Sequence, residues 1–342
     1  MAKEVHASPV VVFLGVESDL SRAHVGGGVV SLRVRRDRLH RLVQTLQEVR
    51  DAGEMPFSIA ASINGKLQFT LSWAFGRFGR AAMQPLVEAQ AERSGWSGGA
   101  LTPGQRASLD FFIAVLPDLP SHDVQLDADR RRPVLLLSDA RWEEDDPEPA
   151  AVGFVLAVPR SDCPPEGPAG REPGAGLDFL RRYYDFEHGS AVVSEEFMRG
   201  FVRRRQQIGQ LEILAAIVPY LSVPGVLAGR EVIHWVDNTS AKAALVHGYS
   251  GVPDSARLVH AFHSFNLGLG ARIWLEWVPS AANPSDEPSR VDLARCDFAI
   301  CDGIVSAPVP LVMPQAEAWA DAAGWAREAV RARAAARGVA AR

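Results

Sequence analysis

The chain has 342 residues, enough for about two domains if a typical domain holds ~150 residues. Hydrophobic residues make up 47% and charged residues 23%, as in ordinary globular proteins with a sizeable core. The formal net charge of −5 excludes a chain that attracts nucleic acid through bulk positive charge, although a local basic groove remains compatible with it. No apolar run reaches the ~18 residues that a membrane span requires, so we expect no membrane partner.

The cysteines argue against a disulfide framework and a zinc site. Cys163, Cys296 and Cys301 are few and odd in number, and no histidine or further cysteine flanks them at ligand spacing. This usage favours a reducing compartment. The apolar residues 10–16 are too few for a signal peptide. We therefore expect an intracellular protein, cytoplasmic or nuclear.

Residues 1–120 are predicted to form a small, mainly helical region with a β-hairpin. Residues 9–15 and 29–34 are rich in β-branched side chains and flank three glycines, 26–28, which favours a hairpin. Residues 37–52 repeat apolar side chains with the period of a helix. The elements that follow are helices over 58–71 and 77–91, a Gly- and Ser-rich loop over 94–104, a helix or strand over 109–116, and a domain boundary within 117–132.

Residues 130–310 are predicted to form an α/β domain, with a mixed sheet and helices on its faces. Residues 134–137 are a continuous apolar run that leads into Asp139, as in a buried strand with an acid at its carboxyl end. Residues 231–236 lead into Asp237 in the same way. The other elements are strands over 152–158, 180–186 and 272–278, a Pro- and Gly-rich insertion over 161–176, helices over 195–218, 240–247 and 255–269, and an Ala- and Arg-rich C-terminal helix over 315–342.

Four acidic residues in this second region are candidates for a metal site. Carboxylates at the ends of neighbouring strands, with one from a packed helix, can hold two Mg²⁺ ions ~3.5–4 Å apart for phosphodiester hydrolysis. Glu212 lies between Leu211 and Ile213, so it is expected to face the sheet. Taken singly, each acid has an ordinary alternative: a strand-end Asp is commonly a turn former or helix cap, and a helical Glu is commonly on the surface. The candidates are Asp139, Glu212, Asp237 and Asp286.

Four segments resemble, in order, the catalytic motifs of the ribonuclease H domains of retroelements. The resemblance implies a ribonuclease H-like fold that cleaves the RNA strand of an RNA–DNA hybrid with two Mg²⁺ ions, or with Mn²⁺. It also implies that Asp139 bridges the metals, while Glu212, Asp237 and Asp286 complete the ligand shells. The segments are VLLLSDA (134–140), QQIGQLEILA (206–215), VIHWVDNTSAKAA (232–244) and WVPSAANPSDEPSR (277–290).

The N-terminal region resembles another part of a retroelement reverse transcriptase. Phe13-Leu14-Gly15 is similar to the end of the palm, and residues 65–86, GKLQFTLSWAFGRFGRAAMQPL, to the thumb or connection. The polymerase motif, an aromatic residue followed by paired aspartates, is missing, because Asp145-Asp146 lies in an acidic loop without such an aromatic. The resemblance therefore implies part or remnant of a retroelement polyprotein that does not polymerise by itself.

One position departs from the family pattern: Ala281 stands where many members carry a histidine that aids product release. This leaves two alternatives to an active ribonuclease H, namely a decayed module that only binds nucleic acid and a nuclease for another task, such as junction cutting or strand transfer. The side chains expected to contact nucleic acid are Arg77, Arg80, Arg203, Arg204, Arg205, Asn238 and Asn283.

Overall fold

The computed structural model describes residues 8–24, 28–73, 77–90, 98–126, 131–144, 146, 148–167, 175–290, 292–301 and 303–314. The chain divides into two compact units between Asp129 and Arg130. The C-terminal helix expected over 315–342, the glycines at 26 and 27 and the aspartate at 145 lie outside the described residues.

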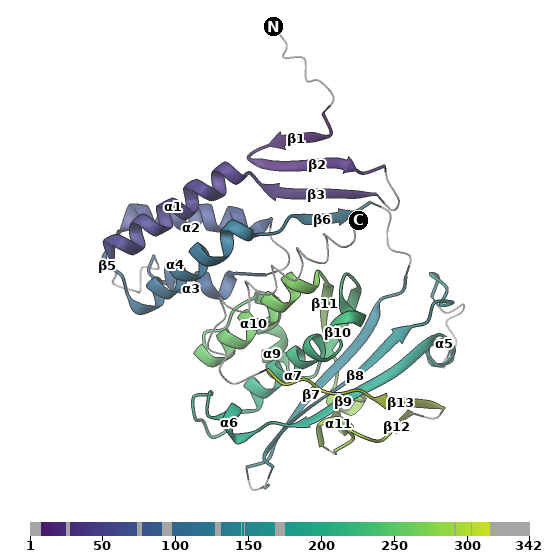
Figure 1. Ribbon diagram of the computed structural model, residues 1–342. Helices are drawn as coiled ribbons and strands as arrows, with labels where there is room; N and C mark the ends of the chain where they lie inside the picture. The colour runs from purple at the N-terminus through teal and green to yellow at the C-terminus, as the bar shows by residue number, and fades with distance from the viewer. Residues whose placement is uncertain are drawn as a thin grey trace. The chain divides into compact units, whose positions relative to one another are not determined.

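The first unit contains a four-stranded antiparallel sheet rather than the single hairpin expected, in the order β1-β2-β3-β6 (Figure 1). The sequence pattern predicts one strand over residues 9–15, but the chain turns at Leu14 and Gly15, both with positive φ, and returns as β2. The strand β6 falls within the expected domain boundary and pairs with β3. Such long-range pairing leaves no local pattern in the sequence. The strands are β1 (Val10–Phe13), β2 (Val16–Arg22), β3 (Val29–Val34) and β6 (His122–Gln125).

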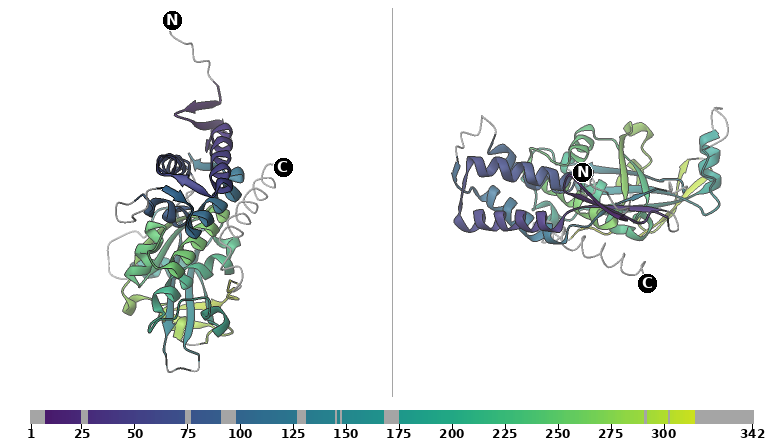
Figure 2. Two further views of the ribbon diagram at one scale, coloured as in Figure 1. Left: turned by 90° about the vertical axis from the view of Figure 1, so that its left-hand side faces the viewer. Right: turned by 90° about the horizontal axis from the view of Figure 1, so that it is seen from above.

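Four helices of the first unit pack into a cluster (Figures 1 and 2). Their apolar faces bury Leu46, Leu67 and Phe112 completely, which accounts for the helical period of the sequence. The segment over 109–116, undecided from sequence, is helical, and Thr102 begins this helix with a capping box to Gln105. The elements are α1 (Arg36–Ala52), β4 (Glu54–Pro56), α2 (Phe57–Ser72), α3 (Arg80–Glu88), β5 (Gly98–Ala100), α4 (Pro103–Val115) and the 3-10 turn η2 (Leu116–Asp118).

The second unit forms a mixed sheet of seven strands among the described residues, in the order β11-β10-β7-β8-β9-β13-β12. The expected mixed sheet with flanking helices is thereby confirmed. β7, β10 and β11 run parallel, β8 runs antiparallel to both of its neighbours, β7 and β9, and β13 runs parallel to β9. The hairpin of β12 and β13, which the sequence did not predict, extends the sheet beyond β9. The strands are β7 (Val134–Trp142), β8 (Ala150–Pro159), β9 (Tyr184–Val192), β10 (Glu231–Val236), β11 (Arg272–Trp277), β12 (Phe298–Cys301) and β13 (Ile304–Pro308).

The main core of this unit lies between the sheet and the helices α7, α9 and α10 (Figure 1). Leu136 and Phe154 from the sheet meet Leu214 and Phe262 from the helices, and all four are buried. No helix among the described residues is long and apolar enough to cross a membrane. The helical elements are α5 (Ala175–Tyr183), α6 (Glu195–Met198), α7 (Ile208–Ser222), α8 (Pro224–Leu227), α9 (Thr239–His247), α10 (Pro253–Leu269), η3 (Ser280–Ala282) and α11 (Asp286–Arg290).

Two expected elements of the second unit were wrong. Residues 180–186 are the end of α5 and the start of β9, not one strand. The long helix expected over 195–218 is broken into α6 and α7, and in the segment between them Arg204 binds Asp254 at 2.6 Å. The proline that was to end the helix, Pro219, lies inside α7.

Candidate metal centre

Asp139 lies within β7 at the point where one of its neighbouring strands ends. The sequence predicted that β7 stops at this residue, but the strand continues to Trp142. The register explains the result: β10 pairs with β7 only as far as Ser138, whereas β8 continues and places Gly153 opposite Asp139. β7 is therefore unpaired on the β10 side from Asp139 onward.

Asp237 directly follows β10 and lies beside Asp139 because these two strands are parallel and adjacent. The following residue, Asn238, begins α9 by accepting a hydrogen bond from the Ala241 amide, so the chain turns away at once. Two donors hold Asp237, one at the end of β11 and one in the turn η3 that follows. The Trp277 indole donates to the Asp237 carbonyl and the Ser280 hydroxyl to its Oδ2, both at 2.9 Å.

Glu212 reaches the same place from α7, which packs on β7. Every residue of this helix from Gln210 to Tyr220 is buried, and Glu212 itself is 4% exposed. Its Oε2 atom is buried without a hydrogen-bond partner. A buried carboxylate oxygen without a donor is unfavourable by several kcal/mol in the charged form, unless a cation compensates it.

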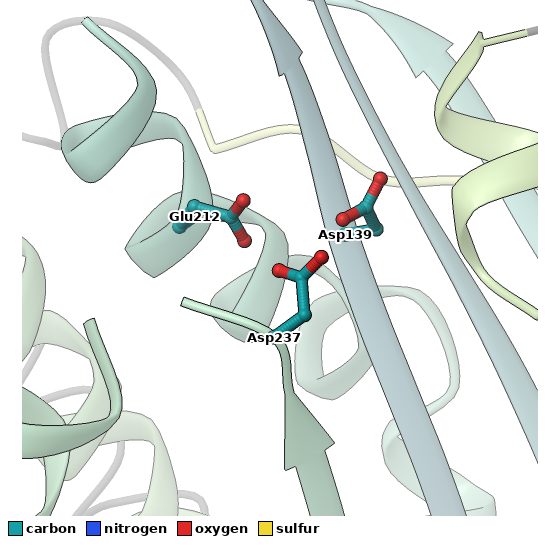
Figure 3. A group of neighbouring side chains, drawn as sticks. All are labelled: Asp139, Glu212 and Asp237. Atoms are coloured by element: carbon teal, nitrogen blue, oxygen red, sulfur yellow. The ribbon is translucent and has the colours of Figure 1, made fainter. Parts of the chain in front are cut away.

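The three carboxylates converge, with one ligand atom of each lying within 4.8 Å of those of the other two (Figure 3). We refer to Asp139, Glu212 and Asp237 as the acidic triad. Oxygen ligands of this kind suit a hard divalent cation such as Mg²⁺. The unpartnered oxygen of Glu212 fits that interpretation, because it is an acceptor for which the protein itself supplies no donor. The triad can therefore hold a metal ion.

Electrostatics within the triad favour protons when no cation is present. Burial, followed by the charges of Asp139 and Asp237, raises the pKa of Glu212 to about 10. Burial also raises the pKa of Asp139 to about 7, although the hydrogen bond from Ser289 opposes the rise. A divalent cation bound among these oxygens would displace the protons.

The fourth expected ligand, Asp286, is not part of the triad. It begins α11 and forms an ion pair at 2.8 Å with Arg290, one turn further along. Its carboxylate is nevertheless near enough to raise the pKa of both Asp139 and Glu212 through its charge. The structure thus brings three of the four predicted acids together and leaves the fourth beside them.

The residues expected to contact nucleic acid lie in different environments, some exposed and others bonded within the protein. Arg203 and Arg205 are exposed in the loop before α7, and Arg77 and Arg80 are exposed in the first unit. Arg204 instead pairs with buried Asp254. The two asparagines act within the protein: Asn238 caps α9, and Asn283 is buried, with its amide 3.4 Å from the carbonyl of Ser138. Arg204 and both asparagines therefore make contacts within the protein.

A basic groove that sequence reasoning missed lies in the first unit, between α1 and α2. It encloses about 560 Å³, and three of its lining residues are cations, whereas none is acidic. The guanidinium of Arg38 also lies 5.4 Å from the centre of the Phe69 ring. Arg38 and Arg41 belong to an arginine cluster visible in the sequence, but only the packing of α1 on α2 adds Lys66. The groove is lined by Val34, Arg38, Arg41, Leu42, Ala61, Ser62, Gly65, Lys66, Phe69 and Thr70.

Comparison with known proteins adds no relative to this description. No protein-family model matches the chain, and a search among curated proteins finds no match either. Two features of the chain itself bear on its function. One is the order of the four motifs in its sequence, and the other is the convergence of three of their acids in the structure.

Proposed function

We propose that the second unit is a divalent-metal-dependent phosphodiester hydrolase of the ribonuclease H type. The observation that carries this proposal is the acidic triad, three carboxylates from separate elements gathered in the interior with one oxygen unpartnered. In the charged form such an arrangement destabilises a protein unless a cation compensates it, and perturbed acids of this kind concentrate at functional sites. The sequence motifs around these acids, which resemble those of ribonuclease H domains, indicate that hydrolysis of a phosphodiester is the activity to test first.

The chain's own residues divide the work of such a site. Asp139, Glu212 and Asp237 would hold the cation, and the cation would activate a water molecule and stabilise charge on the phosphate oxygens. Trp277 and Ser280 fix the backbone and side chain of Asp237. Asp286, paired with Arg290 beside the triad, is available to complete the ligand set.

We infer that the partner is nucleic acid, with an RNA–DNA hybrid as the substrate that the motifs favour. The basic groove supports this partner, because Arg38, Arg41 and Lys66 gather there without an acid in the lining. Among the described residues, Lys66 forms no ion pair, so its charge is available to a phosphate. The net charge of −5 makes such local clustering necessary for binding a polyanion.

The decisive experiment is cleavage of a labelled RNA–DNA hybrid by the full chain, with Mg²⁺, with Mn²⁺ and with chelator. We expect cutting of the RNA strand alone, dependent on metal. Asp237→Asn should abolish it, because the variant keeps the shape of the side chain but loses a charged ligand. Asp178→Asn, which alters an exposed ion pair with Arg181, should retain it. Activity retained in Asp237→Asn would refute the assignment.

A second candidate function is a module that binds nucleic acid without cutting it. Ala281, in the 3-10 turn η3 beside Ser280, occupies the place of the family's histidine and favours this alternative. It predicts salt-sensitive binding of the hybrid with no metal-dependent product. Duplex RNA, duplex DNA and four-way junctions assayed beside the hybrid would separate a ribonuclease H from a nuclease with another substrate.

A further inference from the structure

Helix α11 packs directly on the backbone of the strand beside the candidate metal centre. The contact is with β8 at Gly153, the residue that pairs with Asp139 in the sheet. A Cβ atom on Gly153 would lie 2.5 Å from the Ser289 nitrogen and 2.6 Å from the Pro288 carbonyl carbon. These distances are far below normal contact, so the helix can approach this closely only because residue 153 has no side chain.

This close approach brings one hydroxyl to the triad. Ser289 is 1% exposed, and its hydroxyl donates to Oδ2 of Asp139 at 2.5 Å. Within the described part of the chain, the other acceptor of this hydroxyl is the Asp286 carbonyl of its own helix, at 2.9 Å. A hydroxyl has a single proton, and a carboxylate is the stronger acceptor, so the bond to Asp139 takes precedence.

The segment that carries Ser289 is tied to β7 at a second point. The amide of Asn283 lies 3.4 Å from the carbonyl of Ser138, the residue before Asp139. Ser285 in turn bonds the side chain of Asn283 through its backbone nitrogen and its hydroxyl. Both ends of the segment are therefore registered against the strand that bears the carboxylate.

We propose that Ser289 is a positioning residue that fixes the Asp139 carboxylate for metal binding, and that the missing side chain of Gly153 allows Ser289 to come this close. With one oxygen held by the hydroxyl, the rotation of the carboxylate is restricted, and its other oxygen is kept toward Glu212 and Asp237. Groups that orient metal ligands typically change metal affinity or activity by about 10–100-fold when they are removed. This inference rests on the proposed metal centre.

The test is calorimetric titration of the metal-free full chain with Mn²⁺. Ser289→Ala should weaken Mn²⁺ binding by about 10-fold. Ser289→Thr, which keeps the hydroxyl, should restore most of the affinity. The matched control is Ser264→Ala, because Ser264 is also fully buried but bonds only the His260 carbonyl within α10. This control should bind Mn²⁺ as the wild type does.

A purely structural role for Ser289 would lower the thermal stability of Ser289→Ala and leave its Mn²⁺ affinity at the wild-type value; this result would overturn the positioning role alone. Absence of Mn²⁺ binding by the folded wild type would overturn the metal centre and with it the inference. Gly153→Ala provides an independent arm. The added methyl group should displace α11 and weaken Mn²⁺ binding at least as much as Ser289→Ala does. Unchanged Mn²⁺ affinity in Gly153→Ala would contradict the role proposed for Gly153.

Discussion

Replacing Glu212 with glutamine should make the metal-free protein more stable at alkaline pH, although the change removes a predicted catalytic group. Burial and the neighbouring acids raise the pKa of Glu212 to about 10 in the folded protein, against 4.5 in an ordinary environment. Between these values the folded state holds a proton that the unfolded chain has released. Stability is therefore highest at low pH and is lost as the pH rises toward the folded pKa.

The size of the effect follows from the proton balance. One proton bound only in the folded state lowers the free energy of unfolding by about 1.4 kcal/mol for each pH unit. From pH 6 to pH 8, the wild type should lose about 2.7 kcal/mol relative to Glu212→Gln, whose amide does not titrate. For a domain of about 150–250 residues, this corresponds to roughly 5–10 °C in the melting temperature.

The assay is thermal unfolding in chelator at pH 6 and pH 8. The matched control is Glu196→Gln, an exposed glutamate of α6, which should melt with the pH dependence of the wild type. Mg²⁺ added at pH 8 should stabilise the wild type and the control, because it replaces the proton on the Glu212 carboxylate. It should not stabilise Glu212→Gln, which lacks this carboxylate. Parallel pH dependences for the wild type and Glu212→Gln would show that the carboxylate is not held in the environment described.

Three further predictions concern other parts of the chain. Asp254→Ala should lower the free energy of unfolding by about 2–4 kcal/mol in urea titrations, because it leaves Arg204 without its buried partner. Asp178→Ala, in an exposed pair, should change the free energy of unfolding by less than about 1 kcal/mol, and equal effects of the two variants would contradict the difference in burial. His234→Phe should cost about 2–4 kcal/mol, since it removes the bonds to two buried hydroxyl groups, and a neutral result in the same titrations would contradict the network. Lys66→Ala should weaken binding of a labelled hybrid and reduce the slope of log affinity against log salt by about 1, and an unchanged slope would remove Lys66 from the interface.

Local patterns in the sequence predicted much of the second unit. The apolar runs before Asp139 and Asp237 correspond to the parallel neighbours β7 and β10, and the apolar flanks of Glu212 correspond to a buried helix. These features are readable because a strand covered on both faces is apolar along a continuous run, and a helix buried in the core is apolar on all sides. The three acids are exceptions to that rule, which is why they stand out in the sequence.

Local sequence patterns could not predict which strands pair over long range or which segments come into close contact. The strands β6 and β13 pair with partners far away in the chain, and neither has an apolar run of its own. In the segment between α6 and α7, Arg204 binds Asp254, which lies about fifty residues further on. No periodicity in a local window contains such information.

Which residue types the candidate site contains, and which elements carry them, could be predicted from local features, because hydrophobic periodicity and motif order are local properties. Which acids meet depends on the folded structure. It placed Asp286 outside the triad, in an ion pair with Arg290, and left an oxygen of Glu212 without a donor. It also showed that Gly153 admits Ser289 to Asp139. These outcomes depend on distances between segments that are remote in the chain, and such distances are fixed only when the sheet and its helices pack together.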